Sequence, residues 1–481
     1  MGGPRSQGEE PTPPVLDVDP LVRELGERFR AAGHELYLVG GAVRDRFLGR
    51  PGADDVPDLS TEAVPNETIR ILRGWADQVY LVGVRFGTVE ARKGDRRFEI
   101  TTFREEVYPE QERKPVVTFG KDVHTDLSRR DFTINAMAVR LPEGEFLDPF
   151  GGMKDLAAKV LDTPLDPEVA FSDDPLRMLR AVRFASTLDF EIDPEVMAAI
   201  GAMHERLGIV SRERVRDELS KLMLGAAPSR GLDLATRSGL AGEFLSELPA
   251  LQLEQDPIHR HKDVFRHTLA VLDNVCALDH EAPDLALRLA AVLHDVGKPK
   301  TRQITPEGVS FHHHEVIGAE MAEARLKELR YPSKLVDEVR ELVYLHLRLH
   351  SYRLGWTDKA VRRYVRDAGP LLGKLNALIR ADCTTRNPAR ARELARRVDE
   401  LEEWIRDLAS REELSKMRPA LDGHEIMAHL GIMPGPLVGE AYDFLMEIRM
   451  DEGEIPKEEA FRRLSEWYAA RNQARQALDG G

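Results

Sequence analysis

The stretch YLVGGAVRDRFLG, residues 37–49, decides the fold of the N-terminal part of the chain. A short apolar segment ends at Gly40 and Gly41, and a helix carrying Arg44 and Asp45 is expected to follow. Paired glycines let the backbone approach a phosphate closely, and the N-terminus of a helix favours an anion. The stretch predicts a phosphate-binding strand–turn–helix unit. A tight turn with a surface arginine is an equally good interpretation of these residues alone.

The surrounding residues predict an α/β domain. Residues 20–32 carry apolar side chains at helical spacing, and strands are expected at 79–84, 87–92 and 97–103. From about Asp173 onward the strand pattern fades and helical periodicity takes over. The remaining chain therefore predicts helices, with a loop-like joint at 249–263 and an interruption of the last helical block at IMPGPLVG.

An acidic cluster follows the glycine turn. Asp54, Asp55 and Asp58 lie in GADDVPDLST, and Glu99 lies on a later predicted strand. Several carboxylates beside a phosphate site suit two Mg²⁺ ions, which activate an attacking hydroxyl and bind a triphosphate. Solvated aspartates in a polar loop are the alternative for this segment taken alone.

Two arginine-rich motifs come next. In RRDFTINAMA the double arginine could hold a triphosphate, and Asn135 could bond a sugar or base; a salt-bridged turn is the alternative. In SDDPLRMLRAVRF, Asp174, Arg177, Arg180 and Arg183 are spaced three apart, so we expect them to form a ridge on one helix. Asp and Arg side chains offer acceptors and donors that complement a Watson–Crick edge. A solvated helix face with ion pairs explains this spacing as well.

The order GGAVRD, acidic cluster, EITTFR, RRDFTINA, DPFGG, DDPLRMLRAVRF resembles class II CCA-adding enzymes and bacterial poly(A) polymerases, over roughly residues 35–225. The resemblance implies that Gly41, Arg44 and Arg130 contact the incoming nucleotide. It also implies that Asp174 and Arg177 read its base as a protein template. The expected catalytic residues are Asp55, Asp58 and Glu99, and the expected nucleotide-binding residues are Gly40, Gly41, Arg44, Arg130, Asp131, Asn135, Asp174, Arg177, Arg180 and Arg183, with Arg180 and Arg183 on the triphosphate.

The acidic motif departs from the Asp-x-Asp pattern of this family. Val56 stands where the partner of Asp58 is expected, and Asp55 lies three residues before Asp58. On an ideal strand two such side chains point to opposite faces. A bulge near Pro57 could bring them to one face. We therefore predict Asp58 and Asp55, rather than Asp54, as the Mg²⁺ ligands.

A second constellation lies in the helical part. His267, the pair His294-Asp295, His314, His346 and Asp382 follow one another in an order that resembles the metal sites of HD domains. Imidazoles and carboxylates suit a divalent transition metal. His312 or His313 could replace His314, and His350 shares a predicted helix face with His346. Single histidines on apolar helices are usually core residues, but an adjacent His-Asp with four further members argues against that. The resemblance implies a possible phosphatase or 2′,3′-cyclic phosphodiesterase activity on RNA ends.

Bulk composition sets outer limits. The chain has 481 residues, enough for two to four domains, and its net charge of −15 argues against a general nucleic-acid binder. A local basic patch on an RNA enzyme stays compatible with that charge. The two distant cysteines favour a reducing cytoplasm, and no apolar run approaches a membrane span of roughly 20 residues.

The patterns predict an α+β protein, and the resemblance implies an N-terminal nucleotidyltransferase α/β head, an all-α neck, an HD domain and a helical tail. The expected boundaries are a disordered 1–17, head 18–152, neck 153–250, HD domain 251–400 and tail 401–481. The predicted activity is addition of CMP and AMP to tRNA 3′ ends from CTP and ATP. The alternatives are poly(A) or partial-CCA addition, an HD-type phosphohydrolase for RNA ends, and a non-catalytic RNA-binding protein. The oligomeric state is not predicted.

Overall fold

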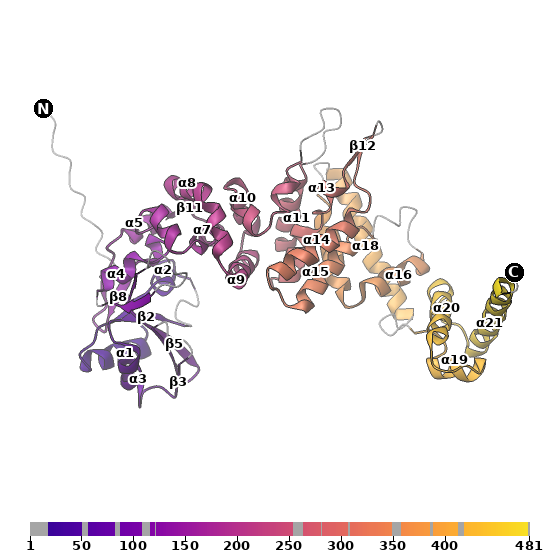
Figure 1. Cartoon of the computed structure of the whole chain (residues 1–481), viewed down its shortest axis with the longest axis horizontal. Helices are drawn as coiled ribbons and strands as arrows, with labels where there is room; N and C mark the ends of the chain where they lie inside the picture. Colours follow the sequence, from indigo (N-terminus) through magenta and orange to yellow (C-terminus); the bar gives the residue numbers. More distant parts are fainter. Residues whose placement is uncertain are drawn as a thin grey trace. The chain divides into compact units, whose positions relative to one another are not determined.

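The computed structural model describes residues 18–50, 56–81, 87–107, 116–120, 122–253, 263–279, 281–305, 308–348, 357–384, 388–411 and 418–479. The chain forms two compact units. The N-terminal unit comprises Met1–Gly225 and Arg230–Phe244, and the C-terminal unit comprises Ala226–Ser229 and Leu245–Gly481. Strands gather in the first part of the N-terminal unit, and helices make up most of the remaining chain (Figure 1).

The head is built on a mixed seven-stranded sheet with strand order β3-β4-β5-β2-β1-β8-β9. The central strand pair β2–β5 is parallel, and the other neighbours are antiparallel. The strands are β1 (Leu36–Val39), β2 (Asp58–Thr61), β3 (Gln78–Tyr80), β4 (Thr88–Lys93), β5 (Arg96–Thr102), β8 (Ala138–Leu141) and β9 (Glu145–Leu147). A separate hairpin joins β6 (Arg104–Val107) to β7 (Val116–Phe119).

Strand β1 lies in the core of the head, since all four of its residues are buried. Helix α1 (Pro20–Ala31) precedes it, with Asp19 accepting a bond from the Leu21 amide and Pro20 in the first turn. Helix α2 (Gly41–Phe47) begins directly after it, and α3 (Pro65–Leu72) and α4 (Val123–Ser128) complete the head. One core cluster includes Tyr37 and Val39 of β1 together with Phe103 and Leu127.

Helices make up most of the second half of the N-terminal unit, after the head. They are α5 (Gly152–Ala158), α6 (Pro167–Asp173), α7 (Leu176–Leu188), α8 (Pro194–Met203), α9 (Arg212–Met223) and α10 (Pro228–Arg237). Helix α7 buries Met178, Leu179 and Val182 and packs against α9. A short parallel pair, β10 (Val160–Leu161) and β11 (Glu191–Ile192), joins distant parts of this region.

The described residues of the C-terminal unit form helices and one hairpin, β12 (Gln303–Thr305) with β13 (Gly308–Ser310). Its helices are α11 (Val264–Leu278), α12 (Leu285–Leu293), α13 (Lys298–Thr301), α14 (His314–Glu328), α15 (Ser333–Leu345), α16 (Asp358–Ala368), α17 (Leu372–Asp382), α18 (Pro388–Arg411), α19 (Gly423–Leu430), α20 (Pro436–Glu452) and α21 (Lys457–Asp479). The last three share a hydrophobic cluster that includes Ile426, Leu445 and Leu464.

The predicted α+β class is confirmed, as are the early helix and the break at IMPGPLVG between α19 and α20. The short strand pairs β10–β11 and β12–β13 were not expected. One local prediction is wrong: Asp174 does not share a helix with Arg177, since Asp174 is extended (φ −141°) and α7 begins at Leu176. The cause is Pro175, because a residue before proline is pushed out of the helical region. Within the described ranges, no helix is long and apolar enough to cross a membrane.

Candidate nucleotide site and metal centre

The turn between β1 and α2 requires glycine. Gly40 adopts φ 71° and ψ −138°, a region that side chains disfavour. A Cβ atom there would lie 2.7 Å from Nη1 of Arg130 and 3.0 Å from Oδ2 of Asp58. Only a residue without a side chain fits at this turn, because Arg130 and Asp58 approach its backbone closely.

Asp58 occupies the first position of β2, directly beside this turn. Nη1 of Arg130 donates to its Oδ2 at 3.3 Å, while Nη2 of Arg130 donates to Ser60 Oγ at 3.3 Å and Asp126 Oδ2 at 3.4 Å. In the parallel pair, Asp58 lies in register with Glu99, so both carboxylates project from one face of the sheet. Asp54 and Asp55 lie outside the described residues.

Arg130 is held as a cation at this point. Burial lowers the pKa of Arg130, but the charges of Asp58 and Asp126 outweigh burial and raise it. The head therefore presents a fixed positive charge next to the candidate metal carboxylate. Such a pairing stabilises the carboxylate as an ion.

A hydrogen-bonded chain connects the glycine turn to α7. Nη1 of Arg44 donates to Asn135 Oδ1 at 2.7 Å, and Nδ2 of Asn135 donates to Asp131 Oδ1 at 2.9 Å. Nε of Arg180 then donates to Asp131 Oδ2 at 2.8 Å. Burial raises the pKa of Asp131, but Arg180 and Asn135 hold it below its usual value. Four predicted nucleotide-binding residues from three segments thus form one network.

Phe184 and Glu218 also belong to this site, and neither was predicted. The guanidinium carbons of Arg183, Arg44 and Arg180 lie 4.0, 5.1 and 5.5 Å from the centre of the Phe184 ring. Glu218 accepts from Arg183 Nε at 2.6 Å, and its Oε1 lies 3.6 Å from Arg180 Nη1. The spacing of the arginines in the sequence indicates the cationic cluster. Its partner Glu218 lies on α9, 35 residues after Arg183, and no local pattern points to it.

The two expected base-reading residues have separate partners. Asp174 accepts from the Leu176 amide at 3.2 Å and from Arg214 Nη2 at 2.7 Å. Arg177 donates to the carbonyl of Ala170 at 3.2 Å and to the carbonyl of Arg129. Both side chains are thus anchored by the elements around α7.

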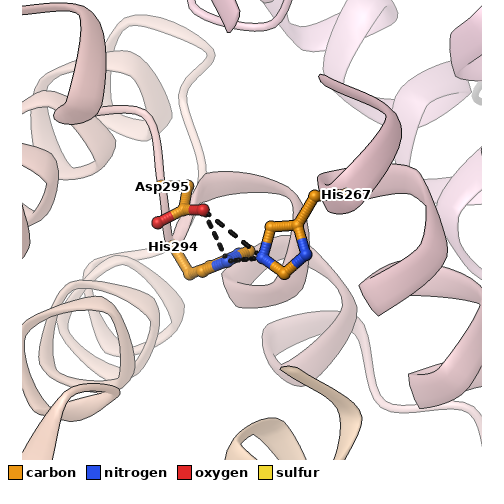
Figure 2. Close-up of side chains that lie close together, drawn as sticks. All are labelled: His267, His294 and Asp295. Atoms are coloured by element: carbon orange, nitrogen blue, oxygen red, sulfur yellow. Dashed lines mark hydrogen bonds and ion pairs between the residues drawn. The ribbon is translucent and has the colours of Figure 1, made fainter. Parts of the chain in front are cut away.

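In the C-terminal unit, the six predicted metal ligands converge. His267 comes from α11, His294 and Asp295 from the end of α12, His314 from the start of α14, His346 from the end of α15 and Asp382 from the end of α17. Figure 2 shows His267, His294 and Asp295 directed toward one another. Nε2 of His267 lies 3.0 Å from Asp382 Oδ1, and Nε2 of His294 lies 3.2 Å from Asp295 Oδ2.

Three of the imidazoles share one orientation toward the backbone. Nδ1 of His294, His314 and His346 each faces a backbone carbonyl, at 2.8, 2.7 and 2.5 Å. Because a carbonyl oxygen only accepts, each Nδ1 donates to it, and each Nε2 is directed at the cluster. Within the part of the chain that the structure describes, Nε2 of His346 is buried without a hydrogen-bond partner.

The buried groups of the cluster shift one another's pKa values: burial lowers the pKa of His294, but Asp295 and Asp382 outweigh burial and raise it. Burial, together with the charge of His294, lowers the pKa of His346 to about 3, so this ring is neutral. Burial raises the pKa of Asp382, but the hydrogen bond from His267 and nearby imidazole charges hold it below its usual range. Four imidazoles and two carboxylates fit a divalent transition metal. Of the alternative ligands, His313 is 82% exposed, and His350 lies outside the described residues.

Family models match three successive parts of the chain. They describe a "Poly A polymerase head domain" at residues 36–162, a "Probable RNA and SrmB- binding site of polymerase A" at 189–251 and an "HD domain" at 264–418. The glycine turn, the sheet carboxylates, Asp131 and Asn135 thus lie in the matched head, whereas Arg180 and Arg183 lie between it and the matched RNA-binding region, and an HD domain follows.

Relatives extend over nearly the whole chain. It is 35% identical to the CC-adding tRNA nucleotidyltransferase of Thermus thermophilus, covering 91% of this chain and 94% of that one. It is also 35% identical to the A-adding tRNA nucleotidyltransferase of Deinococcus radiodurans, covering 86% and 91%. The Bacillus stearothermophilus CCA-adding enzyme in complex with CTP is 26% identical, with a TM-score of 0.66 and coverage of 95% and 100%. The chain belongs to the family of CCA-adding enzymes and bacterial poly(A) polymerases.

Proposed function

We propose that this protein adds CMP and AMP to the 3′ end of tRNA, from CTP and ATP, without a nucleic-acid template. The observation that carries the proposal is the connected network from the glycine turn to α7. It links Arg44, Asn135, Asp131 and Arg180 beside Asp58 and Arg130. Family membership supports the same reaction, since the named relatives are tRNA nucleotidyltransferases.

In this reaction the tRNA 3′ hydroxyl oxygen attacks the α-phosphorus of the nucleotide. A new P–O bond forms, the bond to the bridging oxygen breaks, and pyrophosphate leaves. Mg²⁺, when bound, would lower the charge on the triphosphate and favour the attacking oxygen as a nucleophile. Asp58 would hold the ion, with Glu99 on the same face of the sheet and Asp55 as the second proposed ligand. Arg44, Arg130 and Arg180 would position the phosphates, so catalysis rests on placement and charge.

How much of the CCA end is added is a separate question. Two relatives that match 91% and 86% of this chain are named for CC addition and for A addition, and the CCA-adding enzyme of Anoxybacillus flavithermus matches 94% of it at 29% identity. Other relatives named CCA-adding enzyme reach higher identity over less of the chain: that of Bacillus velezensis is 42% identical over 46% of this chain and 53% of its own length. Addition of the complete CCA is our proposal, and addition of CC or A alone is the second candidate.

One experiment separates these outcomes. Three forms of one tRNA, ending at the discriminator base, at C and at CC, are incubated with CTP, ATP or both. Full activity adds C residues with CTP and completes CCA with both nucleotides. Growth that stops at CC identifies a CC-adding enzyme, and labelling of the CC-ending tRNA alone identifies an A-adding enzyme. Long adenylate tails would indicate poly(A) addition, and no incorporation would refute the proposal.

We assign a second activity to the His/Asp cluster of the C-terminal unit. Its imidazoles and carboxylates would hold a divalent transition metal, which supplies a nucleophilic water for phosphoester hydrolysis. Lys298 donates to Asp295 Oδ2 at 2.6 Å, so a cation lies beside the cluster where a phosphate would bind. The test is opening of a 2′,3′-cyclic phosphate at an RNA end to a phosphomonoester, together with release of inorganic phosphate from an RNA that ends in a phosphomonoester. We place both activities in the cytoplasm, where a free Cys276 and Cys383 are expected to persist.

A further inference from the structure

One face of α9 contacts Asp174, which lies between α6 and α7, and Arg183 of α7. Arg214, Glu218 and Lys221 recur at positions i, i+4 and i+7 of this helix, so they lie on one side of it. Arg214 bonds Asp174, and Glu218 bonds Arg183 while Lys221 donates to Glu218 at 2.9 Å. The same helix face therefore contacts both the expected base-reading carboxylate and the arginine cluster.

The contact between Arg214 and Asp174 fixes a side chain that would otherwise rotate. Asp174 is extended and lies outside α6 and α7, so no helix packing sets its direction. Its Oδ1 accepts from the Leu176 amide at 3.2 Å, and its Oδ2 accepts from Arg214 Nη2 at 2.7 Å. A carboxylate has about four acceptor positions. These two contacts occupy one on each oxygen and leave the others for a ligand.

We propose that Arg214 is a specificity-determining residue that positions Asp174 against the base of the incoming nucleotide. Cytosine and adenine present an amino group at N4 and N6, whereas uracil and guanine present a carbonyl oxygen at the equivalent position. A fixed carboxylate accepts from an amino group and repels a carbonyl oxygen. Arg214 acts through Asp174, because its guanidinium holds the carboxylate in the orientation that meets the amino group. This inference rests on the proposed nucleotide-adding function.

The experiment must distinguish this positioning role of Arg214 from a second role, a contact with RNA. Its side chain is 53% exposed, so it could instead contact an RNA phosphate. A phosphate contact would change tRNA affinity equally for every nucleotide. A positioning role would change the choice among nucleotides and leave tRNA affinity nearly intact.

The experiment compares Arg214→Ala and Arg214→Lys with Arg216→Ala. Arg216 lies two positions along the same helix, where it pairs with Asp217 at 2.7 Å, so it controls for loss of a cation from α9. For each protein, kcat/KM is measured for CTP against UTP and for ATP against GTP on tRNA acceptors. The dissociation constant for tRNA is measured in parallel by gel shift. Because Arg214 is half exposed, all three variants are expected to fold.

Arg214→Ala should lower the preference for CTP over UTP, or for ATP over GTP, by about tenfold or more. Arg214→Lys should restore part of it, and Arg216→Ala should match the unmodified protein. In an Asp174→Asn background, Arg214→Ala should have no further effect on base choice, because the residue through which it acts is already altered. A preference unchanged within about twofold, or independent effects in the double variant, would overturn the positioning role. If the unmodified protein incorporates no nucleotide at all, the proposed function fails first and this inference fails with it.

Discussion

The buried carboxylate of Glu218 offers a quantitative test of how the arginine cluster is held. Its side chain is 4% exposed, and it accepts from Arg183 at 2.6 Å and from Lys221 at 2.9 Å. Glu218→Gln keeps the size and one acceptor oxygen but removes the charge. The positive charges of Arg183 and Arg180 would then lose the nearby negative charge of Glu218. We therefore expect the N-terminal unit to lose stability.

The expected loss follows from burial and screening. Removing one partner of a fully buried ion pair costs about 3–5 kcal/mol. Here Arg180 and Lys221 are 31% and 59% exposed, so water screens part of the interaction. The amide oxygen also keeps one hydrogen bond. We therefore expect a loss of about 2 kcal/mol, which lowers Tm by roughly 4–8 °C for a unit of this size.

The loss should depend on pH with a definite sign. Burial raises the pKa of Glu218, but Arg183, Lys221 and Arg180 hold it below its usual value of 4.5. The folded state thus favours the ionised form, and its contribution is complete above pH 4.5 and disappears as pH falls through the folded pKa. The difference between the unmodified protein and Glu218→Gln should be full at pH 7 and smaller at pH 4.

Calorimetry of the full chain measures both effects. The N-terminal transition is identified as the one that CTP shifts upward. Asp217→Asn is the control, because Asp217 is 57% exposed and its pair with Arg216 should contribute less than about 1 kcal/mol. A Glu218→Gln effect no larger than that of the control, or one that grows as pH falls, would refute this account of the cluster.

Three further outcomes are expected. Gly40→Ala should reduce incorporation by about tenfold or more, because the φ of 71° and the close approach of Arg130 exclude a Cβ atom. The control Gly49→Ala should keep activity, because Gly49 has φ 63° but nothing lies within 4 Å of the added atom. Equal effects of the two changes would contradict the close-approach argument. Asp295→Asn should lower the metal content of purified protein by mass spectrometry, whereas His313→Ala, at an 82% exposed site, should not; metal content unchanged by Asp295→Asn would argue against the cluster as a metal site. Affinity for tRNA should fall on the order of tenfold or more between low and physiological salt, and a flat dependence would exclude a basic contact patch.

The sequence was sufficient for the features that depend on short-range pattern. A buried strand that ends at paired glycines predicted the β1–α2 turn, and the order of histidines and aspartates predicted a cluster that the structure brings together. The turn depends on local spacing, and the cluster depends on short motifs, above all the adjacent His294-Asp295, whose order along the chain resembles HD domains. Asp174 was misplaced although Pro175 was visible, because the helical spacing of the arginines was extended one member too far.

Other features depend on contacts that no local pattern contains. Glu218 meets Arg183 across 35 positions, and Arg214 meets Asp174 across 40. Their partners could be identified only once α9 was seen to pack against α7. The strands β8 and β9 were missed for a similar reason, since β8 is stabilised by pairing with β1, about a hundred residues earlier.

The most direct test of the central claim measures nucleotide incorporation into tRNA by four Asp→Asn variants. Asp58→Asn and Asp55→Asn should each nearly abolish incorporation, because they remove charge from the proposed Mg²⁺ ligands while keeping size. Asp54→Asn should cost little, and Asp295→Asn should leave incorporation intact. If Asp54→Asn nearly abolishes incorporation, the second Mg²⁺ ligand is Asp54 rather than Asp55. If Asp295→Asn abolishes incorporation while Asp58→Asn and Asp55→Asn retain it, the head is not the nucleotidyltransferase site and the account is wrong.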